Sequence, residues 1–199
     1  MIEKKKEGSM RRLLSIICVA VLFCSGCAGI SSKTRAAYKS HLWRGQHYIA
    51  SNKYEKSVKE FTEALKLGEQ INRTKLPTIM LGETYVGGNE IGKASKIANK
   101  ATKNWPKDSS AWELAGKVDL KKNNLNEAEL SLGKALKLAR RQKDRERISS
   151  LISLTKGLQA YSQANIQTTK KRFSEIKDIK LAKDVRSKSV KILGVNMAK

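Results

Sequence analysis

The chain has 199 residues and a formal net charge of +23, and it contains three cysteines, two histidines and two prolines. Aromatic residues make up 6% of it, and apolar and polar residues show no sustained alternation of the kind that marks strands. This pattern excludes a sheet-rich fold and predicts an all-α chain. The basic surplus favours anionic partners or surfaces.

The first 26 residues have the layout of a bacterial export signal. Five basic residues lie among the first twelve, and an uncharged apolar run of fourteen residues follows from residue 13 to residue 26. A helix that crosses a bilayer needs roughly 20 apolar residues, so this run is too short for a spanning anchor. We therefore predict a signal peptide over 1–26 that takes the chain out of the cytoplasm. Met10 is an alternative start, because a compact leader begins there.

Cys27 follows this leader directly. The sequence CSGC over residues 24–27 resembles the lipobox of bacterial lipoproteins, in which a small residue precedes a cysteine that is acylated and becomes the new N-terminus. The resemblance implies a lipid on Cys27 and an anchor and tether over 27–37. It also implies the periplasmic face of the outer membrane, because Ala28 is not the aspartate that retains lipoproteins at the inner membrane. The alternatives are an uncleaved signal anchor and a conventional leader.

Basic residues are concentrated in the last third of the chain. Residues 134–199 hold 18 Lys and Arg against five Asp and Glu. In a cell envelope this surplus would attract anionic lipid headgroups, lipopolysaccharide or peptidoglycan. The alternative is that the lysines only keep helix surfaces solvated. We do not expect nucleic acid as a partner, because an export leader takes the chain away from it and aromatic residues do not alternate with the basic ones.

An internal repeat organises the chain after the tether. Gly45, Gly82 and Gly116 are separated by 37 and 34 residues, and Gly157 follows after 41 more in a poorer fourth copy. Glycine inside a helix costs up to about 1 kcal/mol relative to alanine, so its recurrence predicts close contact with a second helix. Twelve residues after each glycine comes a small or hydroxylated residue that would face it. These residues are Ser57, Ala94, Ala128 and Thr169.

Turn sequences rich in asparagine and glycine separate the two predicted helices of each of the first three copies. They read SNK, GGN and KNN. Asparagine and glycine tolerate the left-handed backbone conformation that ends a helix.

These positions resemble the tetratricopeptide repeat, a 34-residue pair of antiparallel helices with small residues near its eighth and twentieth positions. The third copy is the most similar, with Trp112 at the early tryptophan position, Gly116 and Ala128. The resemblance implies an all-α, right-handed solenoid of about four helix-turn-helix repeats, closed by a C-terminal capping helix. The repeats are expected at 38–71, 75–108, 109–142 and 150–180, and the capping helix and tail at 181–199.

No residues are spaced for catalysis or for metal binding. His41 and His47 are six residues apart, so they do not share the i, i+4 face that a metal site on a helix favours. The sequence has no GxSxG motif, and GGNEIG over 87–92 falls in a predicted turn. We therefore expect no enzyme activity, no cofactor and no metal.

The family resemblance also implies a place for a protein partner, because the concave groove of such solenoids is lined mostly by the first helix of each pair. A mixture of apolar and charged side chains there suits an extended peptide or a partner helix. The corresponding residues are Lys39, Leu42, Gln46, Ile49, Ile79, Glu83, Val86, Glu113, Lys117, Leu120 and Lys121.

From these features we predict a lipid-anchored scaffold that holds another protein during assembly of an envelope machine, such as a pilus, a secretion channel or an outer-membrane barrel. The alternative function is a basic adaptor that binds an anionic envelope polymer or lipid headgroups.

Overall fold

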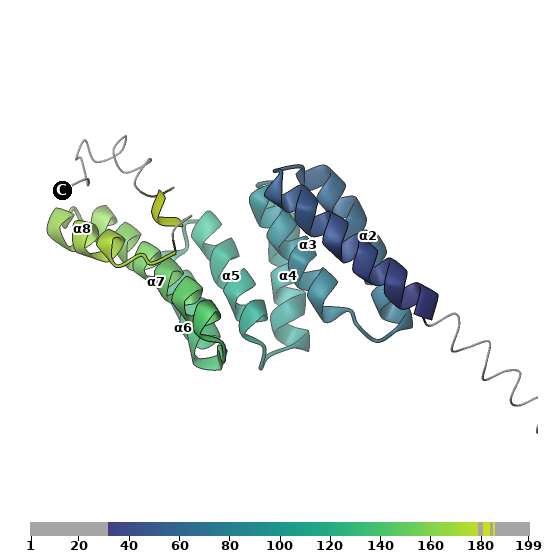
Figure 1. Ribbon diagram of the computed structural model, residues 1–199. Helices are drawn as coiled ribbons and strands as arrows, with labels where there is room; N and C mark the ends of the chain where they lie inside the picture. The colour runs from purple at the N-terminus through teal and green to yellow at the C-terminus, as the bar shows by residue number, and fades with distance from the viewer. Residues whose placement is uncertain (1–31, 179–180, 184, 186–199) are drawn as a thin grey trace, which may run out of the picture.

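The computed structural model describes residues 32–178, 181–183 and 185, and over these residues the chain forms α-helices joined by short turns (Figure 1). A first helix is described from residue 32 to residue 50. It is followed by α2 (Tyr54–Gln70), α3 (Lys75–Gly87), α4 (Ile91–Asn104), α5 (Ser109–Lys121), α6 (Leu125–Leu138), α7 (Gln142–Ser162) and α8 (Ile166–Ser174). The predicted leader over 1–26, Cys27 and most of the predicted capping helix over 181–199 lie outside the described residues.

The helices pack as successive helix-turn-helix pairs in one curved row (Figure 1). Within the described residues there are four pairs: the first helix with α2, α3 with α4, α5 with α6, and α7 with α8. Each helix from α2 onward contacts the next along the chain, and α3 also contacts α5. The fold is therefore an all-α solenoid of tetratricopeptide type, and the predicted fold class is confirmed.

Two helices begin earlier than the sequence suggested. Residues 32–37, expected in a short tether, already belong to the first helix. This stretch reads SKTRAA and contains neither glycine nor proline, so nothing in it opposes a helix. Similarly, α7 begins at Gln142, whereas the fourth copy was expected from residue 150. The longer α7 proves important for the groove described below.

The turns inside the four pairs share one geometry. The residue in each turn with positive φ is Asn52 (55°), Asn89 (60°), Asn123 (61°) or Ala164 (56°). The next residue donates its backbone N–H to a carbonyl five residues earlier, as Lys53 does to Tyr48 at 2.8 Å and Asn124 to Asp119 at 2.9 Å. This is the hydrogen bond of a helix that ends in a left-handed residue. The asparagines thus explain three turns, and Ala164 adopts the same conformation in the fourth.

Three of the four repeated glycines make room for a large side chain of the partner helix, whereas Gly82 makes room for Leu114 of α5 in the next pair. A Cβ atom added at Gly45 would lie 2.6 Å from Cε1 of Phe61, and one added at Gly116 would lie 2.6 Å from Cγ of Leu132. Gly157 meets Phe173 in the same way. The predicted facing column is also buried: Ser57, Ala94, Ala128 and Thr169 have no exposed surface. The small residues therefore bring the two backbones close, and the glycine leaves space for the bulky residue one turn further on.

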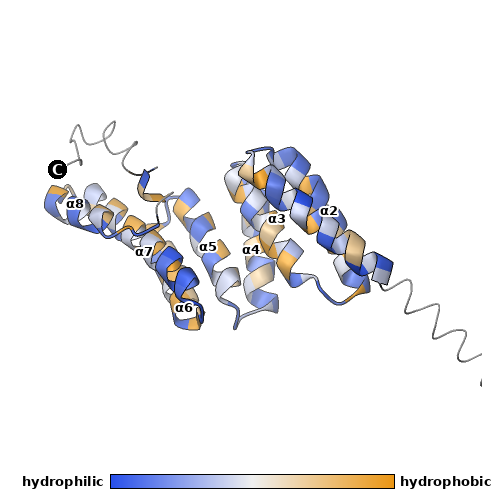
Figure 2. Ribbon diagram, viewed as in Figure 1, coloured by the Kyte–Doolittle hydropathy of each residue, from blue (hydrophilic) through white to orange (hydrophobic). Residues whose placement is uncertain are grey.

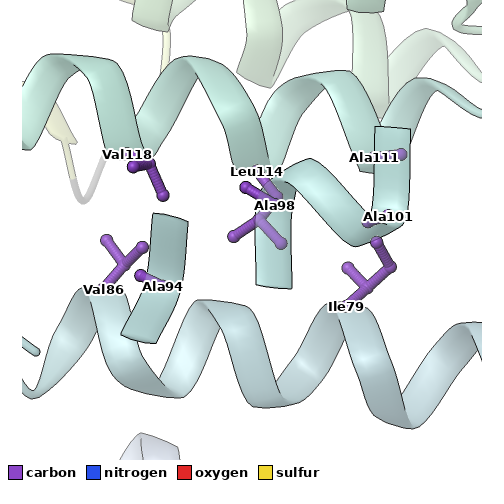
Figure 3. Close-up of a cluster of buried hydrophobic side chains, with 8 residues drawn as sticks. All are labelled: Ile79, Val86, Ala94, Ala98, Ala101, Ala111, Leu114 and Val118. Atoms are coloured by element: carbon purple, nitrogen blue, oxygen red, sulfur yellow. The ribbon is translucent and has the colours of Figure 1, made fainter. Parts of the chain in front are cut away.

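One hydrophobic cluster joins the second pair to α5 (Figure 3). Ile79 and Val86 of α3 lie opposite Leu114 and Val118 of α5, and the alanines of α4 fill the space between them. Figure 2 shows more hydrophobic residues along α3 than along α2 or α6. This fits the position of α3, which contacts α2, α4 and α5 and so has apolar neighbours on several sides. None of the helices in the described part of the chain is both long enough and apolar enough to cross a bilayer.

Candidate functional site

A groove of about 920 Å³ runs across the first helices of the pairs. Its walls come from the first helix, α3, α5 and α7, from the end of α6, and from the two loops that connect α4 to α5 and α6 to α7. The lining residues are Gln46, Ile49, Lys75, Leu76, Ile79, Met80, Glu83, Lys107, Asp108, Ser109, Ser110, Glu113, Lys117, Leu138, Arg140, Arg141, Asp144 and Arg147.

A chain of ion pairs crosses the groove from α3 to α7. Lys117 of α5 binds Glu83 of α3, with Nζ 2.9 Å from Oε1, and also binds Glu113 on its own helix, again at 2.9 Å. Glu113 in turn accepts two hydrogen bonds from Arg147 of α7, at 2.8 and 2.7 Å. Both contacts between helices join residues 34 positions apart. The repeat period therefore places each cation beside a carboxylate of the preceding pair.

The network continues at the two loops. Asp144 binds Arg147 at 3.0 Å and Arg141 at 2.6 Å. Asp108 caps α5 by accepting a hydrogen bond from the Ser110 backbone N–H, and it also binds Lys75 at 2.6 Å. As a result, each of the carboxylates that line the groove has a cation from the chain itself.

These pairs shift the ionisation of the buried groups. Burial raises the pKa of Glu113, which is 3% exposed, but the hydrogen bond from Arg147 and the charge of Lys117 outweigh burial and hold that pKa below its ordinary value. Burial lowers the pKa of Lys117, but the charges of Glu83 and Glu113 outweigh it, so this pKa lies above its ordinary value. The network therefore stays charged at neutral pH.

Two cations of the groove remain without such a partner. Lys107 lies on the loop before α5 and Arg140 on the loop before α7, and both are exposed. In the part of the chain that the structure describes, neither forms an ion pair. The indole N–H of Trp112 donates to the Pro106 carbonyl at 2.8 Å, which holds the loop that carries Lys107. The rim of the groove is therefore positively charged.

Comparison with known families supports the repeat assignment. Residues 38–70 match the tetratricopeptide repeat. This match covers most of the first helix and all of α2, and the next three helix pairs continue the helix-turn-helix arrangement. Comparisons with curated proteins and with solved structures gave no significant match. Tetratricopeptide repeats typically bind protein partners, so the groove is the candidate binding site for such a partner.

The structure brings six of the eleven predicted groove residues together in this groove. They are Gln46, Ile49, Ile79, Glu83, Glu113 and Lys117. Leu42 and Val86, each 8% exposed, instead lie in the hydrophobic core, because they face the neighbouring helix rather than the groove. Lys39, Leu120 and Lys121 are not among the residues that line it.

The groove residues contributed by the loops and by the start of α7 were not predicted from the sequence. The most important are Arg147, Asp144, Lys107 and Arg140. Arg147 lies in the part of α7 that precedes the expected fourth copy, so an alignment on Gly157 does not reach it. The 34-residue spacing between Glu113 and Arg147, with opposite charges at the two positions, was the signal that could have found this pair.

Proposed function

We propose that the groove binds a segment of a partner protein that carries acidic side chains, and that the chain acts as a non-enzymatic scaffold. The observation that carries this proposal is the charge balance of the groove. Its carboxylates are already held by cations of the chain, whereas Lys107 and Arg140 form no ion pair with any of the described residues. In the same groove, Leu76 and Met80 offer apolar contacts, and Leu76 is 45% exposed. Such a surface suits a segment with alternating acidic and apolar residues.

Photo-crosslinking from the groove tests this proposal. A photoreactive residue at Leu76 should capture a partner from membranes. The same residue at Leu130, which is 69% exposed on α6 and does not line the groove, should not capture it. Equal capture from both positions would show that the groove is not the binding surface.

Charge reversal at the rim tests the chemistry of the partner. Replacing Lys107 and Arg140 by glutamate should weaken binding of the captured partner by up to about 30-fold, since each exposed pair contributes up to about 1 kcal/mol and 1.4 kcal/mol is a factor of ten. Lys96→Glu is the matched control, because Lys96 is exposed on α4 outside the groove. A loss of the same size in the control would point to net charge instead of the rim.

We further propose that an acyl lipid on Cys27 anchors this scaffold to the periplasmic face of a bacterial membrane, where it helps to assemble an envelope complex. The order of basic segment, apolar segment and CSGC supports this. Labelled fatty acid should enter the intact protein and not the Cys27→Ser variant. Equal labelling of the two proteins would refute the anchor.

A second candidate function is binding of an anionic envelope polymer or of lipid headgroups. The excess of basic residues over 134–199 favours it. Salt separates the two functions, because contacts between exposed charges are screened within about 8 Å at physiological ionic strength. Groove binding that includes apolar contacts should survive moderate salt, whereas polyanion binding should fall steeply.

A further inference from the structure

One column of the repeat packs the second and the third pair of helices onto the pair before them. This column lies two residues before the repeated glycine and holds Trp43, Met80, Leu114 and Thr155. Leu114 of the third pair packs against Gly82 of the second and is fully buried. Met80 of the second pair packs on the core cluster of the first, and Thr155 has no exposed surface.

Trp43 occupies the same column in the first pair but has no described helix in front of it. The first helix lies at the N-terminal end of the row (Figure 1), and Trp43 is 68% exposed. Its ring stacks on His47, with centroids 5.7 Å apart and planes at 12°, which holds it against the helix surface. Single exposed apolar residues are common. Trp43 differs because the fold places it where other pairs insert a side chain into a neighbour.

The surface around Trp43 carries positive charge. Ala36, Lys39, Trp43, His47 and Ala50 are all exposed and recur every three or four residues, so they share one side of the helix. Lys33 and Arg35 are exposed at the edges of this side. The described residues from 32 to 50 include no aspartate or glutamate.

We propose that this side of the first helix, which we name the Trp43 face, docks on an anionic bilayer surface. A tryptophan beside lysines is the combination that sits in the headgroup region of a membrane. A second copy of the chain is disfavoured as the occupant, because each copy without residues 1–26 holds 36 basic and 16 acidic side chains, a net charge of +20. The proposal rests on the proposed anchor in one respect: a lipid on Cys27, sixteen residues before Trp43, would keep the Trp43 face close to the membrane.

Tryptophan fluorescence in vesicles tests the docking. The full chain, purified from membranes with Cys27 intact, is reconstituted into vesicles of phosphatidylcholine and phosphatidylglycerol that contain brominated phosphatidylcholine as the quencher. The emission of Trp43 is the difference between the unchanged protein and Trp43→Phe, which retains Trp105 and Trp112. We expect the Trp43 emission to be quenched in these vesicles. It should recover in vesicles that contain the same brominated phosphatidylcholine but no phosphatidylglycerol.

Charge variants test the role of the lysine. Lys39→Gln should reduce the ratio of docked to undocked protein about fivefold, as expected for one basic residue near an anionic surface. Lys96→Gln, an exposed lysine on α4, should leave it unchanged. Unquenched Trp43 emission with anionic lipid, or equal quenching in both kinds of vesicle, would overturn the proposal. A third outcome would also overturn the proposal: Trp43 is not quenched in the unchanged protein, and the Trp43→Ser variant no longer captures the partner. This outcome would identify the Trp43 face as a protein interface.

The mass of the N-terminal peptide separates this inference from the anchor. If Cys27 carries no lipid, the proposed anchor fails, but quenching at saturating anionic lipid would still support docking of the Trp43 face. If Cys27 is acylated and Trp43 is not quenched, the anchor stands and the docking inference fails.

Discussion

Arg147 of α7 and Glu113 of α5 form a two-point ion pair, with N···O distances of 2.8 and 2.7 Å, across 34 residues of sequence. Glu113 is 3% exposed, so its charge is stable only because Arg147 and Lys117 surround it. This pair and the contact between Lys117 and Glu83 link three successive repeats along the groove. The same residues therefore stabilise the array and shape its candidate binding surface.

Removal of the Glu113 carboxylate should strongly destabilise the protein. We expect Glu113→Ala to lower the free energy of unfolding by about 3 kcal/mol, because it leaves Lys117 without one of its two carboxylates and Arg147 without its two-point partner. Urea unfolding followed by circular dichroism measures this. Glu63→Ala is the control, since the pair between Glu63 and Lys66 is exposed and contributes at most about 0.5 kcal/mol. Equal losses in both variants would contradict the role assigned to Glu113.

The same carboxylate should make stability depend on acid pH. The pKa of Glu113 lies below its ordinary value in the folded protein, so the unfolded chain binds this proton first as pH falls. The stabilisation is present at neutral pH and should be lost as pH drops below about 4.3, the ordinary value for glutamate. Thermal unfolding from pH 7 to pH 3 measures it. Glu113→Gln should start with a lower Tm and lose less of it on acidification, whereas parallel curves for the two proteins would refute this prediction.

The two glycines of the third helix pair should respond to alanine in opposite directions. At Gly116 an added Cβ would lie 2.6 Å from Cγ of Leu132, so Gly116→Ala should cost about 1–3 kcal/mol through overpacking. At Gly133 nothing lies within 4 Å of an added Cβ, so Gly133→Ala should stabilise α6 by up to about 1 kcal/mol. Chemical unfolding of the two variants compares them. A gain in stability at Gly116 would show that its column does not require glycine.

Ala164 is the one alanine among the five described non-glycine residues with positive φ, at 56°. The left-handed conformation costs most residues about 1–2 kcal/mol, and asparagine adopts it more readily. We therefore expect Ala164→Asn to raise the free energy of unfolding by about 1 kcal/mol. The reciprocal change Asn123→Ala, at φ 61° in the preceding pair, should lower it by a similar amount. The same sign of change in both variants would contradict a conformational origin.

Burial explains why the sequence predicted only part of the groove. Leu42 and Val86 were assigned to it because they lie on the first helix of a pair, yet both are core residues. In this solenoid the first helix of a pair also contacts its own partner and its neighbours, so only one narrow side of it reaches the groove. The width and direction of that side depend on how the helices cross, which spacing along the sequence does not specify.

The sequence by itself determined the helical pairs of this protein. Glycines and small residues at matched positions let the two helices of a pair pack closely. Asparagines in three of the turns adopt the left-handed conformation that ends the first helix of a pair. The tertiary structure decided which charges meet. Glu113 pairs with Arg147 because both lie near the N-terminal ends of their helices, α5 from Ser109 and α7 from Gln142, and these ends come together at the groove. An ion pair between helices depends on their relative placement in space, and that placement follows from the packing of the whole array.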